Sequence, residues 1–286
     1  MQDTKRSNGI PMRPLGATGE MVTILAIGGY HVAKGISEGE SIRINRTAID
    51  EGVNFMDNAW CYHDGVSEQV MGKALTDGYR DRVLLMTKNH GRDRRTFEQQ
   101  LAESLRRLRT DMIDVLQFHA ISNDQEIHDI VAKSALEAAI EAREQGKIRY
   151  IGFTGHTSPR LHLRMLERYH WDTVQLPVNL LDYHYDSFTQ QVLPVLQRRE
   201  IGAIGMKSLG GGDLFKTDIP PDQAIAWTLS QPIDTLVLGI DSLEILHHNL
   251  ELVRAWQPMP TTKAQSLQAQ VAPIADGSLE HYKPKP

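Results

Sequence analysis

Eight short apolar segments alternate with helical patterns over roughly 250 residues, and this alternation predicts a (β/α)8 barrel. Each segment is too short for a typical helix and is apolar on both parities, which is typical of strands buried on both faces of a parallel sheet. The rival fold, a doubly wound sheet that binds dinucleotides, would need a GxGxxG motif after its first strand, where this chain has GGYHVAKG. The predicted strands are residues 23–28, 53–57, 83–88, 114–119, 149–154, 173–178, 202–207 and 235–240.

Helical spacing of apolar residues is clearest in residues 96–109, where four apolar side chains mark one face. Thr96 and Gln99 form a candidate capping box at the start of this helix. Residues 126–145 form another predicted helix, which Gly146 would end in a left-handed cap. No linker divides the chain. We therefore expect one barrel domain over residues 1–286, with a short N-terminal extension and a C-terminal tail from about residue 256 that carries a candidate helix at 262–272.

Composition excludes several classes of protein. The 286 residues carry a net charge of -5 with both signs mixed, and no basic stripe indicates nucleic-acid binding. No apolar run has the 18 residues or so of a membrane span, and the polar N-terminus lacks the apolar region of a secretory signal. The single cysteine, Cys61, excludes an internal disulfide and a cysteine-rich metal site. We expect a reduced, cytoplasmic, globular protein, whose oligomeric state the sequence leaves open.

Ionisable residues stand where consecutive predicted strands end. The segment GVNFMDNAWCYHDGVSEQVMGKAL, residues 52–75, places Asp57 at the end of the second strand and Tyr62 in the loop after it. Lys88 ends the third strand and His119 ends the fourth. The chemistry of a (β/α)8 barrel lies at the carboxyl ends of its strands, so these four side chains are expected to converge at one mouth.

These four residue types together suit proton donation to a carbonyl oxygen. A tyrosine has a pKa near 10, which a neighbouring ammonium such as that of Lys88 would lower. Asp57 would hold Lys88 charged by an ion pair, and His119 would hydrogen-bond the phenol or the substrate oxygen. A proton donor of this kind needs a hydride source, which predicts a nicotinamide cofactor.

The chain resembles the aldo-keto reductase family along most of its length. The segment containing Asp57 and Tyr62 resembles the family's G-x-N-x-x-D-T-A-x-x-Y-G-x-x-E-x-x-x-G pattern, while LLMTK and DVLQFHA resemble the strands that carry its catalytic lysine and histidine. The resemblance implies a catalytic tetrad of Asp57, Tyr62, Lys88 and His119. It also implies an NAD(P)(H)-dependent oxidoreductase that interconverts a small carbonyl compound and its alcohol, with Tyr62 as the proton donor.

The resemblance further implies a cofactor site along the mouth. Thr154 and Gly155 match a Ser-Asn pair that holds the nicotinamide amide, Gln175 matches a glutamine in the sixth strand, and Met206 stands in place of a stacking tyrosine. The implied cofactor residues are Gly29, Asp57, Thr154, Gln175, Met206, Lys207, Ser208, Leu209, Gly210, Gly239, Ser242 and Asn249. The predicted substrate pocket consists of Tyr30, Trp60 and His119.

The segment after the eighth strand bears on the choice of cofactor. A 2′-phosphate is usually held by an arginine or lysine, and residues 239–249 contain neither. Asp241 would repel the phosphate, although Lys207 or His248 could reach it. We therefore expect NADH to serve at least as well as NADPH.

Two other functions stay open at this stage. A nicotinamide-binding regulatory subunit that senses redox state would need the same barrel with little turnover. A barrel metallohydrolase commonly carries His-x-His after its first strand, which this chain lacks, and DYHYD at 182–186 is a weak ligand set, so no metal is expected. Cys61 is expected to have no catalytic role, and His31, His63 and His156 lie in loops at the mouth.

Overall fold

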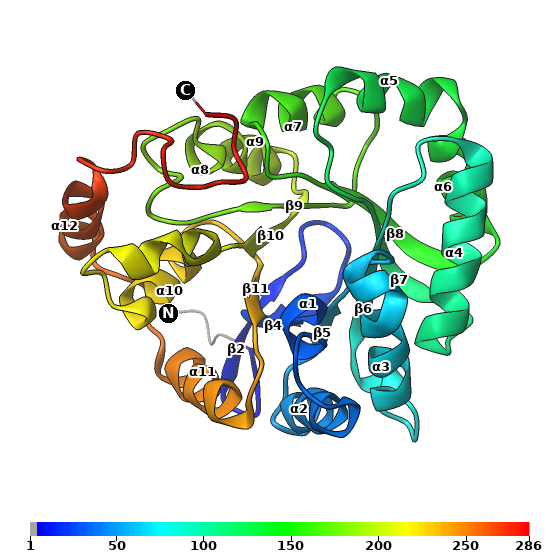
Figure 1. Ribbon diagram of the computed structural model, residues 1–286, viewed down its shortest axis with the longest axis horizontal. Coiled ribbons are helices and arrows are strands. Elements are labelled where there is room, and N and C mark those ends of the chain that lie inside the picture. Colours follow the sequence, from blue (N-terminus) through cyan, green and yellow to red (C-terminus); the bar gives the residue numbers. More distant parts are fainter. Residues whose placement is uncertain (1–4, 286) are drawn as a thin grey trace.

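A computed structural model describes residues 5–285 and has a closed barrel of eight parallel strands, in the order β10-β11-β4-β5-β6-β7-β8-β9 (Figure 1). Each of the eight predicted segments forms one of these strands, so the (β/α)8 fold is confirmed. All-buried strands such as β6 and β7 explain why apolar residues occur on both parities. The barrel strands are β4 (Leu25–Gly28), β5 (Phe55–Asp57), β6 (Leu84–Asn89), β7 (Ile113–Phe118), β8 (Ile148–Thr154), β9 (Thr173–Pro177), β10 (Gly202–Met206) and β11 (Thr235–Gly239).

Helices surround the barrel, with α12 at its edge (Figure 1). The helices are α1 (Gly29–Val32), α2 (Glu38–Asp50), α3 (Val66–Ala74), α4 (Arg94–Leu108), α5 (Asp124–Ala132), α6 (Ala135–Glu144), α7 (Pro159–Leu166), α8 (Phe188–Gln191), α9 (Leu193–Arg198), α10 (Pro221–Leu229), α11 (Leu243–Ala255) and α12 (Thr261–Val271). Short 3₁₀ turns are η1 (Tyr62–Gly65), η2 (Arg80–Arg82) and η3 (Gly210–Lys216). Among residues 5–285, none of these helices combines the length and the apolar composition required to span a bilayer.

Two helix predictions need correction. Helix α4 begins at Arg94, because the Asp93 carboxylate accepts the Thr96 backbone N–H at 2.9 Å and caps the helix before the predicted box. The predicted helix over residues 126–145 is interrupted between α5 and α6, because Ser134 has a φ of 59° in the left-handed region. The tail helix α12 lies within one residue of its predicted bounds.

The N-terminal extension closes one end of the barrel. Strands β1 (Arg6–Ser7), β2 (Ile10–Pro14) and β3 (Met21–Thr23) form a small antiparallel sheet. Leu15 and Val22 from this region join the apolar cluster inside the barrel, which also includes Phe55 and Leu84 at the starts of β5 and β6. The extension therefore fills the amino-terminal end of the barrel, and the carboxyl ends of the strands form the opposite mouth.

Candidate active site

The ammonium of Lys88 is the centre of the predicted tetrad. It donates to the Asp57 carboxylate, to the Asn58 backbone oxygen at 2.6 Å, and more weakly to the Tyr62 hydroxyl at 3.4 Å. Asp57 ends β5 and Lys88 is the penultimate residue of the neighbouring strand β6, and their side chains are 4% and 1% exposed. Because water is excluded from this ion pair, the ammonium interacts strongly with the phenol oxygen and can stabilise negative charge on it.

The loop after β5 is hydrogen-bonded to the carboxyl-terminal half of β6. These bonds fix the part of the chain that leads to Tyr62. The Asn58 and Trp60 backbone N–H groups donate to the Met86 and Lys88 backbone oxygens at 2.8 and 3.0 Å. The chain then reverses through η1, where Gly65 has a φ of 87°. This φ lies in the left-handed region, which favours glycine at the turn.

Protonation of the tetrad differs in one respect from the expectation. Burial alone would lower the pKa of Lys88, but its contacts with Asp57 and Tyr62 outweigh burial and raise the pKa, so the ammonium stays charged. Burial raises the pKa of Tyr62, and Lys88 lowers it as predicted, but the effect of burial is larger, so the pKa lies above its usual value. Tyr62 is therefore a neutral phenol, the form that can donate a proton.

His119 lies beside the Tyr62 ring. It directly follows β7, and its backbone N–H donates to the Asn89 backbone oxygen at 2.9 Å. Its imidazole meets the Tyr62 ring edge-on at a centroid distance of 5.7 Å. Burial, followed by the charge of Lys88, lowers the pKa of His119 well below its usual value, so the imidazole is neutral.

The structure brings one of the two predicted aromatic wall residues to the tetrad. The Tyr30 ring contacts the Tyr62 ring edge-on at 5.3 Å and is 41% exposed. Trp60 instead turns toward α4, where its indole donates to the Glu103 carboxylate at 2.7 Å and lies under the Arg107 guanidinium. A place for Trp60 in the substrate wall therefore stays a prediction without a contact to support it.

Gln175 provides the observation that tests a cofactor site. Its amide nitrogen donates to Asp57 at 3.3 Å, while its Oε1 is buried without a hydrogen-bond partner among the described residues. Thr154 lies directly opposite Gln175 in the pairing of β8 with β9. A buried acceptor is costly when it is left unsatisfied, and the amide of a nicotinamide ring would supply the missing donor. These residues fit the group that the family resemblance implies.

The other predicted cofactor residues follow β4, β10 and β11. Gly29 begins α1, and a Cβ there would lie 2.8 Å from the Asn58 side chain. Met206 ends β10, and Lys207 has a φ of 57° and an ammonium 5.0 Å from the centre of the Tyr282 ring. Ser208 is buried, Leu209 is half-buried and Gly210 is buried at the start of η3. The loop that they form begins at the mouth.

Residues after β11 have structural roles of their own. The His31 ring covers Gly239, where a Cβ would lie 2.2 Å from the imidazole Nδ1. Ser242 caps α11 by accepting the Ile245 backbone N–H at 3.2 Å, and Asn249 is buried on that helix. Within residues 5–285, Ser242 and Asn249 make no hydrogen bond with the tetrad, so their cofactor role stays a prediction.

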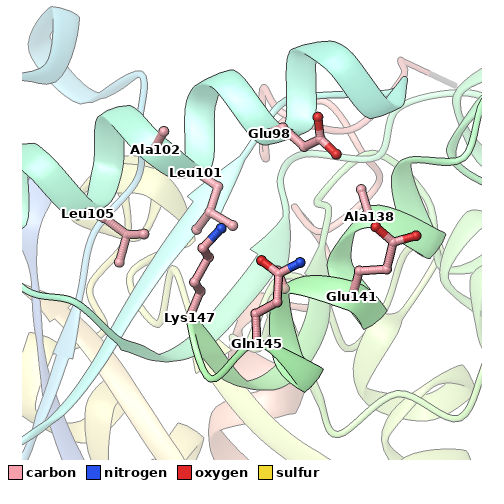
Figure 2. Close-up of a pocket in the computed structure, with 9 residues that line it drawn as sticks. Glu98, Leu101, Ala102, Leu105, Ala138, Glu141, Gln145 and Lys147 are labelled. Carbon is pink, nitrogen blue, oxygen red and sulfur yellow. The ribbon is translucent and has the colours of Figure 1, made fainter.

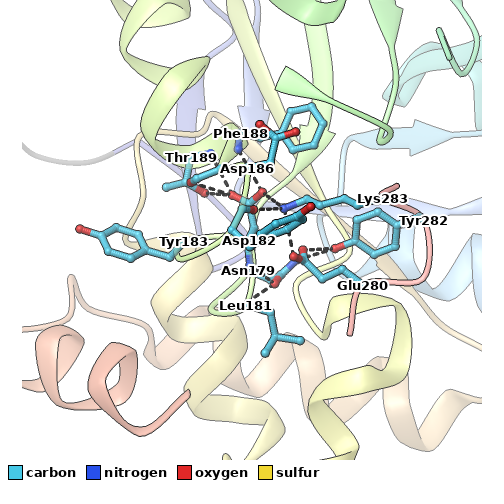
Figure 3. A network of polar contacts seen from close by, with 12 residues as sticks. Asn179, Leu181, Asp182, Tyr183, Asp186, Phe188, Thr189, Glu280, Tyr282 and Lys283 are labelled. Atoms are coloured by element: carbon cyan, nitrogen blue, oxygen red, sulfur yellow. Dashed lines mark hydrogen bonds and ion pairs between the residues drawn. The ribbon is translucent and has the colours of Figure 1, made fainter. Parts of the chain in front are cut away.

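The C-terminal tail packs against the loop after β9, a contact that the sequence analysis missed (Figure 3). The Lys283 ammonium lies 2.8 Å from an Asp182 oxygen and 3.0 Å from a Glu280 oxygen, and its side chain is 0% exposed. Tyr282 accepts from the Asn179 amide at 3.0 Å and donates to Glu280 at 2.6 Å. A buried polar network therefore holds the end of the tail, in addition to the apolar packing of Ala275 and Leu279.

The same tail also contacts the loop after β10. The Asp213 carboxylate of η3 accepts the Glu280 backbone N–H at 3.0 Å and lies 3.2 Å from the His281 imidazole. The Tyr282 ring lies beside the His156 ring, at 5.9 Å, as well as under Lys207. Tail residues therefore connect the loops after β8, β9 and β10, which include the predicted cofactor residues Lys207 to Gly210.

A separate groove of about 280 Å³ lies between α4 and α6 on the outer wall of the barrel (Figure 2). Charged and apolar side chains line it, including Glu98, Leu105, Glu141 and Lys147. None of its lining residues belongs to the tetrad or to the predicted cofactor set. The groove is therefore not the site that the sequence predicts.

The chain is similar to a family model and to several known proteins. Residues 24–226 match the family model described as "Aldo/keto reductase family". The chain is 27% identical over 266 residues to "Aldo-keto reductase AFTS1" of Alternaria alternata, an alignment that covers 78% of this chain and 70% of the relative. It is 28% identical over 226 residues to "L-galactose dehydrogenase" of Arabidopsis thaliana, covering 74% and 69%.

Among solved structures, the holo form of aldo-keto reductase AKR11C1 from Bacillus halodurans superposes with a TM-score of 0.78 at 23% identity. That superposition covers 91% of this chain and 96% of the other, and it supports the barrel fold. The family match spans well over half of the chain, including the strands that carry Asp57, Lys88 and His119. The chain belongs to the aldo/keto reductase family and is an oxidoreductase of that family.

Proposed function

We propose that this chain interconverts a small carbonyl compound and its alcohol with a nicotinamide cofactor, and that Tyr62 is the proton donor. The contact of the Lys88 ammonium with both Asp57 and the Tyr62 hydroxyl is the observation that carries the proposal. When bound, the cofactor supplies a hydride to the carbonyl carbon. Tyr62 gives its phenol proton to the carbonyl oxygen as negative charge develops there, and Lys88 stabilises the phenolate that remains.

Two further residues orient the reacting groups in this proposal. The neutral His119 imidazole can donate a hydrogen bond to the carbonyl oxygen beside Tyr62. Gln175 and Thr154 would hold the nicotinamide amide, because the unpaired Gln175 oxygen is the acceptor that the amide N–H group needs. Asp57 contacts both Lys88 and Gln175, so it links the proton donor to the cofactor site.

A panel of aldehydes, quinones, keto sugars and keto steroids, assayed with NADPH and with NADH, tests this function. We expect at least one class to be reduced with oxidation of the cofactor and formation of the matching alcohol. Cofactor binding without turnover of any class would instead favour the regulatory subunit.

Lys88→Met is expected to lower carbonyl reduction by about 10²–10³-fold, the usual effect of removing one electrostatic stabiliser of the transition state. The ammonium lowers the pKa of Tyr62 against the effect of burial, so its loss should raise that pKa further. Oxidation of the alcohol needs the phenolate form, and its rate should therefore rise only at higher pH than in the wild type. The measurement is the pH profile of kcat/KM in both directions, and profiles of unchanged height and position would contradict the role of Lys88.

NADH is expected to support reduction at least as well as NADPH. Asp241 is exposed after β11, and the two basic groups that could reach a 2′-phosphate already have partners. His248 lies 2.8 Å from the Asp222 carboxylate, and the Lys207 ammonium lies over the Tyr282 ring. The measurement is the ratio of kcat/KM for the two cofactors, and an NADPH preference above about tenfold, roughly 1.4 kcal/mol, would contradict the prediction.

Asp241→Arg should shift this ratio toward NADPH, because a guanidinium can pair with the phosphate. The matched control is Glu144→Arg, which makes the same charge change at an exposed position on α6. The control should leave the ratio unchanged.

A further inference from the structure

A cysteine and two histidines form a cluster beside Tyr62 that the proposed reaction does not explain. The Cys61 sulfur lies 3.2 Å from His90 Nε2 and 3.6 Å from His119 Nδ1. The three atoms all lie within 4.8 Å of one another, and the two imidazole rings are 4.5 Å apart. The residues follow three neighbouring strands, β5, β6 and β7, so the barrel itself brings them together.

The spacing of this cluster matches tetrahedral coordination. Zinc forms bonds of about 2.3 Å to cysteine sulfur and about 2.0–2.1 Å to histidine nitrogen, which at a tetrahedral angle places sulfur and nitrogen about 3.6 Å apart. The two observed sulfur–nitrogen distances, 3.2 and 3.6 Å, are close to this separation before any metal is present. Two imidazoles and one thiolate leave the fourth position for water, as in zinc sites with three protein ligands.

Accessibility and charge also suit a divalent cation. All three residues are only partly buried, so an ion can reach them from the mouth. A neutral imidazole has a lone pair for a metal, and a cysteine binds as its thiolate, so binding displaces the thiol proton. The positive charge of Lys88 would repel a metal ion at the cluster, but this charge is paired with the Asp57 carboxylate.

We propose that Cys61, His90 and His119 bind Zn²⁺ reversibly, with water as the fourth ligand, and that the bound ion inhibits carbonyl reduction. The inhibition rests on the proposed function, because His119 belongs to both the cluster and the tetrad. A metal on His119 Nδ1 fixes the ring toward Cys61 and His90 and fills space beside the Tyr62 hydroxyl. The carbonyl oxygen then loses its place between the phenol and the imidazole.

Binding is tested without any assay of turnover. Zn²⁺ alone is titrated into the metal-free protein by calorimetry, and Co²⁺ alone is followed by absorption, where a thiolate ligand gives a charge-transfer band and tetrahedral geometry gives intense visible bands. We expect one Zn²⁺ per chain and both cobalt signatures. Cys61→Ser should abolish the charge-transfer band, and Cys61→Ser and His90→Gln should each weaken Zn²⁺ binding at least tenfold, since even partners of metal ligands are worth about 10–100-fold.

His128→Gln is the matched control, because it removes an exposed imidazole on α5 outside the cluster. Its Zn²⁺ affinity should equal that of the wild type. Absence of Zn²⁺ binding to the wild type, or equal affinity in Cys61→Ser, His90→Gln and the control, would overturn the site. Circular dichroism of each variant checks that it is folded.

Inhibition is measured separately, with one carbonyl substrate and with each protein compared with its own metal-free rate. Zn²⁺ should lower the wild-type rate, a chelator should restore it, and Cys61→Ser should need at least tenfold more Zn²⁺ for the same inhibition. Zn²⁺ bound at the cluster with an unchanged wild-type rate would overturn the inhibition. Failure of every carbonyl substrate would contradict the proposed function instead, because calorimetry and cobalt absorption do not depend on turnover.

Discussion

Tyr62→Phe is expected to lower kcat for carbonyl reduction by about 10²–10⁴-fold, the usual contribution of a positioned proton donor. The substitution removes the hydroxyl that lies 3.4 Å from the Lys88 ammonium and leaves the ring in place. That ring keeps its edge-on contacts with Tyr30 and His119, so the mouth should retain its shape. The Kd of the cofactor should therefore be almost unchanged, which separates a loss of chemistry from a loss of binding.

Tyr79→Phe is the matched control for this variant. It removes a phenol hydroxyl that donates to the Asp50 carboxylate at 3.0 Å. This bond joins the segment after α3 to the end of α2, and neither residue belongs to the tetrad. We expect its kcat to equal that of the wild type. A Tyr62→Phe enzyme that reduces carbonyls at the wild-type rate would remove Tyr62 as the proton donor.

Lys283→Met is expected to release the C-terminal tail. The substitution keeps the length of the side chain but leaves the Asp182 and Glu280 carboxylates without their buried cation. Breaking a buried ion pair by removing one partner typically costs about 3–5 kcal/mol. Hydrogen exchange of the Glu280 and Lys283 backbone amides measures the free energy of opening, because both amides are hydrogen-bonded at 3.0 and 2.8 Å in the docked tail.

Lys285→Met is the control, because Lys285 is exposed two residues further along the tail. Its amide exchange at Glu280 should match that of the wild type. The Lys283 variant should also bind the cofactor more weakly, since Glu280 holds Asp213 of the loop after β10. Wild-type protection of these two amides in Lys283→Met would show that the buried network does not hold the tail.

The barrel could be predicted because the burial of each strand is visible in the residues of that strand. A strand such as β7 is buried along its whole length, and apolar residues on both parities are the direct trace of that burial. The break between α5 and α6 could not be predicted in the same way. Ser134 adopts a left-handed φ of 59°, a conformation that serine shows only when the surrounding structure imposes it.

The position of the tetrad could also be predicted, because the ends of parallel strands meet at one mouth. The pKa of Tyr62 could not, since the balance between burial and the Lys88 charge depends on side chains from several loops. His90 carried a signal that was missed: it lies two residues after Lys88, and alternate residues of an extended segment share a face. Asp182, the partner of Lys283 in the loop after β9, left no such signal, because it lies 101 residues away in sequence.

Transfer of a labelled hydride tests the central claim most directly. The enzyme, a carbonyl substrate from the panel, and NADH or NADPH with deuterium at both C4 positions of the ring are allowed to react, and the alcohol is analysed by mass spectrometry and NMR. If the chain reduces carbonyls as proposed, the alcohol carries cofactor deuterium on its carbinol carbon, and its hydroxyl proton comes from the solvent through Tyr62. An alcohol without deuterium at that carbon, or deuterated cofactor recovered unreacted with every carbonyl class, would contradict the proposed function.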